Sequence, residues 1–424
     1  MQNLRQLSHR KAHARRARAS RGMNPRWHIA VAAVLGVLLF LATSFGLAWM
    51  RLQGNVSVEN IDQIIGDRPT TKTSQPPIDP NAGNPINLLV MGSDVRHGDF
   101  ADAKIEGMRS DATMLIHIAA DRSRIDAVSI PRDLRIDIPS CNLRDGSTTK
   151  ATRKAKFNEA FARGGAQGNV AEAAACTIKT VESLTGIYID DYVVVDFQGF
   201  QTMVDALGGV PLYFPKDVDD RRADLHIKKG CRLLDGHDAL AAARSRYAQG
   251  DGSDIGRIDR QQQLVAAIIR EALSRNLLTN MPSLYTFLDA ATQSLSTGPQ
   301  IGSLSTMAGL AYSVRNIDPA HITFMTAPFD WAGGEIYMGK DAERIWTNII
   351  MDRPLTYDPS AATASASPSP SETASPDTAS PTPSASATTS SPTPTPSPTL
   401  EHGTTAEQDD EFPRCTRANA EPNE

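Results

Sequence analysis

Three short clusters of residues combine aspartate with serine or arginine, and each lies at the end of an apolar run. The clusters are Gly92-Ser93-Asp94, Arg109-Ser110-Asp111 and Pro131-Arg132-Asp133. Carboxylate oxygens suit hard divalent cations, and the forked guanidinium of arginine matches the oxygens of a phosphate. If the clusters lie together, they can therefore hold a divalent cation beside a phosphate group.

The apolar runs at residues 86–91, 113–118 and 125–130 have the length and the β-branched content of buried strands. If they pair as an antiparallel meander, the second run starts where the first ends, and the third ends where the second starts. All three clusters then meet at one edge of a sheet, which predicts the site there. The competing interpretation is that the clusters are strand-end turns whose Asp and Arg side chains pair on the surface.

A second informative stretch, residues 234–263, contains four arginines close together. A helix is predicted over 255–275, and it places several polar residues on one face. Arginine suits bidentate phosphate binding better than lysine does, so the stretch predicts an anion site. The alternative is that these arginines are solvated helix charges. The residues that we expect to bind substrate here are Arg244, Arg246, Arg257, Arg260 and Gln261.

Strands and helices alternate irregularly after the opening meander, within a predicted globular domain at residues 85–358. This favours an α/β fold with a mixed, largely antiparallel central sheet flanked by helices, and not a doubly wound sheet. The further helices are predicted at 158–163, 170–184 and 199–207, and the further strands at 188–197, 210–214 and 321–326.

One segment, residues 29–50, contains 22 consecutive uncharged residues, enough to cross a bilayer. Trp27 and Trp49 bracket it, and the basic flank lies on its N-terminal side. These features predict a transmembrane signal anchor in the cell membrane, single-pass, with the N-terminus in the cytoplasm and the globular domain extracellular. A cleaved signal peptide is the alternative, but no clear cleavage site is present. Residues 51–84 are predicted to be an extracellular linker.

Charge and composition describe the two ends of the chain. Residues 1–28 carry eight Arg and Lys and no acidic residue, whereas the whole chain has a net charge of −5. Beside a membrane span, topology and attraction to anionic lipids explain this basic cytoplasmic tail better than nucleic acid does. Residues 359–424 are rich in Ser, Thr and Pro and then acidic, so they cannot bury a core and are predicted to be disordered.

All four cysteines, Cys141, Cys176, Cys231 and Cys415, lie beyond the predicted span. An even number of cysteines outside a membrane favours two disulfides, and their spacing matches no zinc site. Three pairings are possible. A slight preference goes to Cys141–Cys231 with Cys176–Cys415.

The chain contains none of the motifs of nucleophilic hydrolases, P-loop proteins, zinc proteases or dinucleotide-binding proteins. Its segments instead resemble, in order, those of the LytR-CpsA-Psr family of bacterial cell-envelope proteins. The matching segments are NLLVMGSD (87–94), RSDATMLIHI (109–118), AVSIPRDLRIDIPS (127–140), KFNEAFARGG (156–165), DYVVVDFQGFQTMVDALGGV (191–210), LDGHDALAAARSR (234–246) and DIGRIDRQQQ (254–263).

The resemblance implies a phosphotransferase that moves a wall glycopolymer from a polyprenyl-pyrophosphate carrier to peptidoglycan. It implies that Asp94 and Asp111 bind Mg²⁺, and that Asp133 and Asp254 orient arginines or act as bases. The family's pyrophosphate-binding arginines match Arg109, Arg132, Arg244 and Arg246, with Arg257, Arg260 and Gln261 alongside. Mg²⁺ and an arginine cage suit this chemistry because charge builds on phosphate oxygens as the pyrophosphate breaks.

Two other functions use the same residues. One is a polyprenyl-phosphate-binding envelope regulator without turnover, and the other is a pyrophosphatase in which water replaces the sugar acceptor. The complete set of Asp and Arg positions favours transfer over binding alone. The chain departs from the family in the long, charged loop between Asp94 and Asp111, and in the Ser/Thr/Pro-rich tail, which replaces a further domain found in some relatives.

Overall fold

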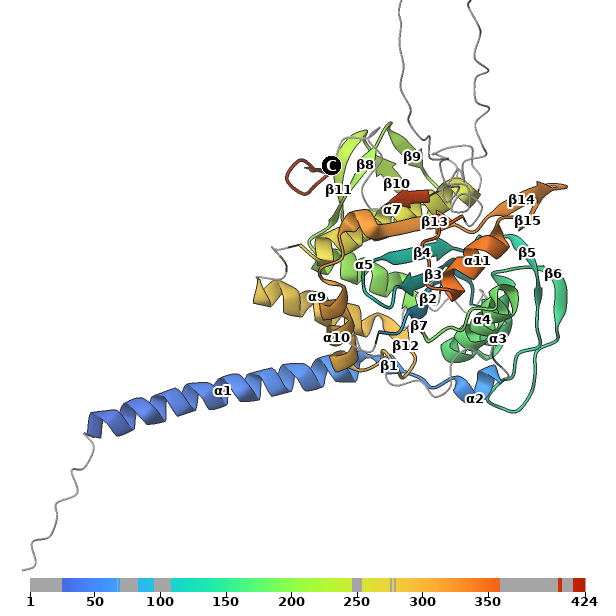
Figure 1. Cartoon of the computed structure of the whole chain (residues 1–424). Coiled ribbons are helices and arrows are strands. Elements are labelled where there is room, and N and C mark those ends of the chain that lie inside the picture. The colour runs from blue at the N-terminus through green and yellow to red at the C-terminus, as the bar shows by residue number, and fades with distance from the viewer. Residues whose placement is uncertain are drawn as a thin grey trace, which may run out of the picture. The chain divides into compact units, whose positions relative to one another are not determined.

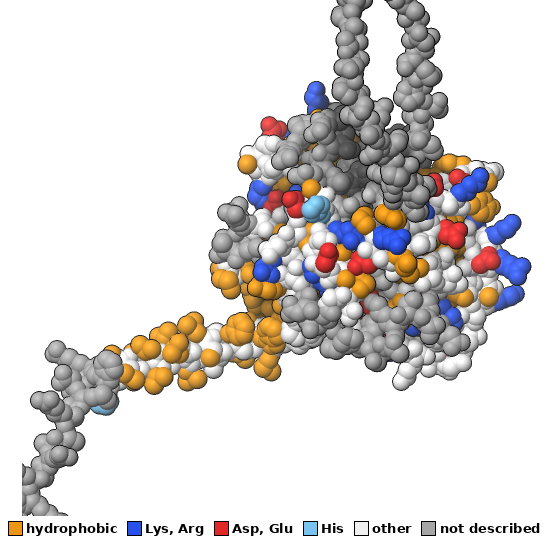
Figure 2. All heavy atoms as spheres, in the orientation of Figure 1, with side chains coloured by type: hydrophobic (Ala, Val, Ile, Leu, Met, Phe, Trp, Pro, Cys, Tyr) orange, Lys and Arg blue, Asp and Glu red, His pale blue; other side chains and the backbone are white. Residues whose placement is uncertain are grey.

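The computed structural model of the protein describes residues 25–66, 68, 83–94, 108–245, 254–274, 277, 280–358, 403–405 and 415–423. The chain divides into two units, residues 1–51 and 52–424. Most of α1 (Pro25–Asn55) belongs to the first unit, and hydrophobic side chains cover its visible face (Figure 2). By length and composition, residues 28–55 can cross a membrane.

An eight-stranded sheet forms the centre of the second unit (Figure 1). Strand β2 pairs antiparallel with β3, and β3 with β4, which is the predicted meander. The β2–β7 and β4–β13 pairs are parallel. The sheet is therefore mixed, as predicted. Its order is β1 (Ser57–Val58), β12 (Leu295–Thr297), β7 (Asp191–Asp196), β2 (Ile86–Ser93), β3 (Ser110–Ile118), β4 (Ile125–Ser129), β13 (Ile322–Thr326) and β16 (Gly403–Thr405).

Helices pack on both faces of this sheet because side chains alternate along each strand. Leu89 and Leu115 are fully buried on the face that α4 covers, whereas Met114 on the other face packs against Ala266 of α7. The elements on the first face are α2 (Asp62–Ile65), α3 (Glu159–Gly164), α4 (Val170–Thr185) and α11 (Ala342–Ile350), and those on the second are α7 (Asp254–Ala272) and α10 (Leu304–Val314).

The helix α4 shows how the sequence defines these elements. Asn169 begins it, because the Asn169 side chain accepts a hydrogen bond from the Glu172 backbone N–H. Gly186 ends it in the left-handed conformation, with φ of 69°. The alanines between them, Ala173 to Ala175, allow close packing against α3 and the sheet.

A second apolar core lies beside the central sheet and contains Val204, Leu212 and Leu264. Its elements are α5 (Phe197–Ala206), α6 (Gly236–Arg244), α7, α9 (Met281–Gln293), β8 (Val210–Phe214), β9 (Val218–Asp220), β10 (Leu225–Ile227) and β11 (Gly230–Leu234). A separate four-stranded sheet has the order β14 (Phe329–Ala332), β15 (Glu335–Met338), β5 (Leu134–Ile138) and β6 (Thr152–Lys156).

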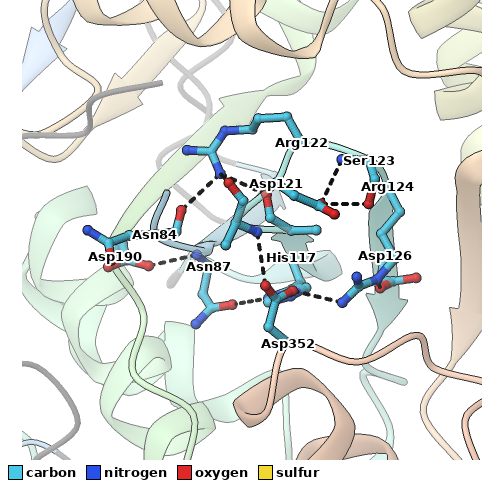
Figure 3. Close-up of polar contacts among 12 residues, drawn as sticks. Asn84, Asn87, His117, Asp121, Arg122, Ser123, Arg124, Asp126, Asp190 and Asp352 are labelled. Carbon is cyan, nitrogen blue, oxygen red and sulfur yellow. Dashed lines mark hydrogen bonds and ion pairs between the residues drawn. The ribbon is translucent and has the colours of Figure 1, made fainter. Parts of the chain in front are cut away.

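A buried polar network joins β3 and β4 to the residues after α11 (Figure 3). The His117 ring is fully buried. Its Nδ1 lies 2.7 Å from Asn87 Oδ1, and its Nε2 lies 3.0 Å from Asp352 Oδ1. Arg124 donates to Asp352 at 2.8 Å and to Asp126 at 2.9 Å. Burial raises the pKa of Asp126 to about 6, against the opposing effect of Arg124.

The four cysteines form two disulfides, as predicted, but the preferred pairing was wrong. The bonds are Cys141–Cys176 and Cys231–Cys415. The first joins the segment after β5 to α4 within the main core. The second attaches the C-terminal residues 415–423, whose strand β17 (Glu421–Pro422) pairs with β11. The folded part of the C-terminal segment is therefore larger than predicted, because β16 also pairs with β13.

The predicted linker at residues 51–84 is partly folded into the second unit. Ile61, Ile64 and Ile65 are buried in the main core, and β1 pairs with β12. Gln53 donates to the Gly302 carbonyl. The described domain therefore begins near residue 52, not near residue 85.

Candidate active site

The three clusters found in the sequence meet at one edge of the central sheet. Ser93, the last residue of β2, pairs with Ser110, the first residue of β3. Ser129, the last residue of β4, pairs with Met114 on the same side. The predicted meander therefore brings Asp94, Asp111 and Arg132 to one edge.

Asp94 is bonded to the backbone of Arg109. The Asp94 N–H donates to the Arg109 carbonyl at 3.1 Å, and the Arg109 N–H donates to Asp94 Oδ1 at 2.6 Å. Burial raises the pKa of Asp94, the Arg109 N–H opposes this, and the negative charge of Asp111 raises the pKa further. The two carboxylates are thus close enough to repel each other, which a bound cation would relieve.

Arginines from two elements contact Asp111. Arg132, which follows β4, donates from Nη1 to Asp111 Oδ1 at 2.5 Å. Arg257, buried on α7, donates from Nη2 to the Asp111 backbone carbonyl at 3.4 Å. Asp111 therefore connects the predicted metal site with the predicted phosphate-binding arginines.

Asp133 has two cationic neighbours. Lys156 of β6 donates to Asp133 Oδ1 at 2.7 Å, and Arg132 Nε lies 3.8 Å from Asp133 Oδ2. This geometry favours the orienting role for Asp133 that the sequence left open. Lys156 was missed from the sequence, although it begins the matching segment KFNEAFARGG.

Arg260 and Gln261 contact backbone carbonyls at the end of α6. Buried Arg260 donates to the Ser245 carbonyl, and Gln261 donates to the Ala243 carbonyl at 3.1 Å. Burial lowers the pKa of Arg260. Both residues therefore fix the segment that carries Arg244. Their direct contact with substrate stays a prediction.

Arg244 lies near the same edge of the sheet because its side chain contacts the first residue of α5. Its guanidinium carbon lies 5.1 Å from the centre of the Phe197 ring. Phe197 begins α5 directly after Asp196, and Asp196 pairs with Ser93 across β7 and β2. Asp196 was also missed from the sequence, although it lies in the matching segment DYVVVDFQG.

Two predicted site residues cannot be placed. Arg246 lies outside the described residues, and so does the side chain of Asp254, whose backbone begins α7. Residues 95–107, between the two aspartates, are likewise outside the described part.

The donor set suits a hard divalent cation. Asp94 accepts the Arg109 N–H through Oδ1, and Asp111 accepts Arg132 Nη1 through Oδ1. Two neighbouring carboxylate oxygens match the one or two protein ligands that Mg²⁺ usually takes beside phosphates. The arrangement can therefore hold a cation and a pyrophosphate side by side.

Comparison with known proteins gives a family match. The model of the family described as LytR_cpsA_psr matches residues 49–349. The polyisoprenyl-teichoic acid–peptidoglycan teichoic acid transferase TagV of Bacillus subtilis (strain 168) is 30% identical over 60% of this chain and 58% of that protein. The chain therefore spans less than two thirds of that relative.

A second relative supports the same family, and two solved structures share the fold. The transferase of the same description named TagU, from Halalkalibacterium halodurans, is 30% identical over 70% of this chain and 88% of that protein. A LytR-Csp2A-Psr enzyme from Actinomyces oris has a similar fold, with a TM-score of 0.50 and 21% identity over 69% of this chain and 95% of that one. The solved structure of a protein from Streptococcus agalactiae has a TM-score of 0.52 and 22% identity. The match covers 65% of this chain and 90% of that one.

Proposed function

Because the chain belongs to the LytR-CpsA-Psr family, we propose that it transfers a glycopolymer from a polyprenyl-pyrophosphate carrier to peptidoglycan. The observation that carries the proposal is the contact of Asp111 with Arg132 and Arg257 beside Asp94. Asp111, Arg132 and Arg257 come from three separate parts of the chain. A strand-end turn with surface ion pairs would not need a buried arginine from α7.

The proposed metal ligands are Asp94 and Asp111. When bound, Mg²⁺ supplies positive charge beside the pyrophosphate oxygens. Arg132 and Arg257 lie next to Asp111, so they bind and orient the phosphate oxygens. Asp133 and Lys156 hold Arg132 in place.

Arg244 binds the second phosphate in this proposal. Arg260 and Gln261 fix the backbone beside it, so the arginine is positioned before the donor arrives. The acceptor hydroxyl attacks the phosphorus that carries the glycopolymer, and the bond from this phosphorus to the bridging oxygen breaks. Polyprenyl phosphate leaves with the bridging oxygen, and the hydroxyl proton passes to the leaving phosphate or to water. Arginines on the leaving phosphate stabilise the charge that develops there.

The helix α1 is the proposed membrane anchor. It places the domain on the side of the membrane opposite the basic tail, which is the extracellular side. The lipid-linked donor and the anchored enzyme then share one membrane.

The test uses the full-length protein in nanodiscs with a polyprenyl-pyrophosphate-linked glycopolymer. Release of polyprenyl phosphate is measured with Mg²⁺ or EDTA, and with or without peptidoglycan. We expect release that needs both Mg²⁺ and peptidoglycan. Release without an acceptor would indicate a pyrophosphatase, and binding without release would indicate a carrier or regulator.

A further inference from the structure

The chain enters the second unit through hydrogen bonds to α9 and to the start of α10. Gln53 donates to the Gly302 carbonyl at 3.1 Å and accepts from the Leu304 N–H at 2.7 Å. Asn55 donates to Asp289 Oδ1 at 2.9 Å and to Thr292 at 3.2 Å. Figure 1 shows α9 and α10 beside β1 and β12 at this end of the domain.

Only Arg51 and Leu52 separate the apolar run from Gln53. Three residues of chain span at most about 11 Å, so Gln53 lies within about 11 Å of Met50. The polar layer of a bilayer is roughly 5–8 Å thick on each side. If residues 29–50 span the bilayer, the short connection keeps the part of the domain bonded to Gln53 close to the membrane surface.

The outer face of α10 is uncharged and carries one large aromatic side chain. Residues 304–314 include no charged residue. Leu310 and Val314 pack inward against the sheet, whereas Ala308 and Ala311 are exposed. The Tyr312 side chain is 64% exposed, although it is large and apolar except for its hydroxyl.

Arg315 follows the helix and lies over Tyr312. Its guanidinium carbon is 3.4 Å from the centre of the Tyr312 ring. An aromatic ring with a polar tip suits the boundary between lipid tails and headgroups, and an arginine beside it suits lipid phosphates. This pair is thus complementary to a phospholipid surface in both polarity and charge.

We propose that the exposed face of α10, with Tyr312 and Arg315, lies on the phospholipid bilayer and holds the domain against it. The inference rests on the membrane anchor of the proposed function and names a second membrane contact. It replaces the predicted linker, which would have lifted the domain away. A domain fixed in this way has less freedom to turn relative to the lipid-linked donor.

The test is photocrosslinking of the full chain in nanodiscs of phosphatidylcholine and phosphatidylglycerol. Benzoylphenylalanine replaces Tyr312, and lipid adducts are measured by mass spectrometry. The matched control is the same replacement at Trp331, an aromatic residue of similar exposure (61%) on β14. We expect at least tenfold more lipid adduct at position 312. Equal yields at the two positions would overturn the proposal.

Two further positions make the result specific. Benzoylphenylalanine at Ser305 reports on the entry point, and at Leu38 it reports on the span. Adducts at 305 without adducts at 312 would overturn the proposal, because the helix would then not lie along the surface.

A double variant tests the roles of Tyr312 and Arg315. With the probe at Ala308, the double variant Tyr312→Asp, Arg315→Glu should lose most of its lipid adduct. An unchanged yield there would also overturn it.

The experiment contains no donor or acceptor, so it is independent of transfer activity. Labelling at 38 but not at 312 refutes the membrane contact of α10 alone. No labelling at 38 refutes the anchor, and with it part of the proposed function. Labelling at both, in a protein that transfers no glycopolymer, refutes the transfer and leaves the surface contact in place.

Discussion

At the scale of single residues, Asp111 is the centre of the candidate site. Its carboxylate accepts from Arg132, its backbone carbonyl accepts from Arg257, and its charge acts on Asp94. One residue thus connects two arginines with the second proposed metal ligand. Its side chain remains partly exposed, at 29%, so a ligand can reach it.

Replacing Asp111 should therefore remove metal-dependent turnover. Asp111→Asn keeps the size of the side chain but removes a charged metal ligand and the ion pair with Arg132. We expect a loss of at least about 100-fold in polyprenyl phosphate release, the scale of losing an electrostatic contact in a transition state. Asp330→Asn, at an exposed position on β14, is the control. Similar rates in both variants would remove Asp111 from the site.

Arg244 should contribute to donor affinity. Losing a charge-assisted hydrogen bond costs about 1.5–3 kcal/mol, so Arg244→Ala should weaken binding of the pyrophosphate lipid roughly 10- to 150-fold. The control is Arg153, an exposed residue of β6 in the separate four-stranded sheet, and Arg153→Ala should leave affinity unchanged. Isothermal titration without Mg²⁺ separates binding from turnover. Equal affinities of the wild type and Arg244→Ala would show that Arg244 is a solvated surface charge.

The sequence predicted the grouping of Asp94, Asp111 and Arg132 because strand pairing determines where strand ends meet. It did not predict what Arg260 and Gln261 contact. A helical pattern shows which residues share a face, but not whether that face meets a ligand or a backbone carbonyl. Only the packing of α7 against the end of α6 reveals the hydrogen bonds to Ala243 and Ser245.

At the scale of elements, the network around Asp126 holds β3 and β4 to the segment after α11. In the fold the pKa of Asp126 is about 6, above the value of about 3.9 in an unfolded chain. The folded chain therefore binds this proton more tightly. The stabilisation is complete below about pH 4 and is lost as the pH rises through about 6.

This gives a test of the network by denaturant unfolding. Between pH 4 and 6, the stability of the wild type relative to Asp126→Asn should fall by up to about 1.4 kcal/mol per pH unit. A pH-independent difference between the two proteins would show that Asp126 does not titrate in this way.

The Cys141–Cys176 disulfide should stabilise the fold. It closes a loop of 35 residues between the segment after β5 and α4. The double variant Cys141→Ser, Cys176→Ser should lose about 2–4 kcal/mol of unfolding free energy. Mapping of peptides without reduction should find both disulfides and no free thiol. A Cys141–Cys231 peptide would contradict the structure.

Elements that depend on distant partners were the ones that the sequence did not reveal. Leu52, Ile61 and Ile65 are separated by polar residues, so the segment resembles a linker until α4 and the sheet cover it. The C-terminal residues 415–423 are polar, and their attachment depends on Cys231 and on β11. Disulfide pairing likewise depends on tertiary distance, which spacing in the sequence does not contain.

At the scale of the whole molecule, the second unit combines a mixed sheet with a site at one of its edges. The sheet sets the spacing of Asp94 and Asp111, and α6 and α7 add arginines from the other core. The fold class, the family and the apolar N-terminal helix were all predicted from the sequence. The reason is that strand periodicity, motif order and an uncharged run are local features.

The most direct test of the central claim is the chemistry of the product. The full-length protein in nanodiscs receives Mg²⁺, peptidoglycan and a polyprenyl-pyrophosphate-linked glycopolymer, and mass spectrometry follows the peptidoglycan sugars. The account predicts a new phosphodiester between glycopolymer and peptidoglycan, formed in step with released polyprenyl phosphate and absent with Asp111→Asn. Release of polyprenyl phosphate with no such linkage, or linkage that persists in Asp111→Asn, would contradict it.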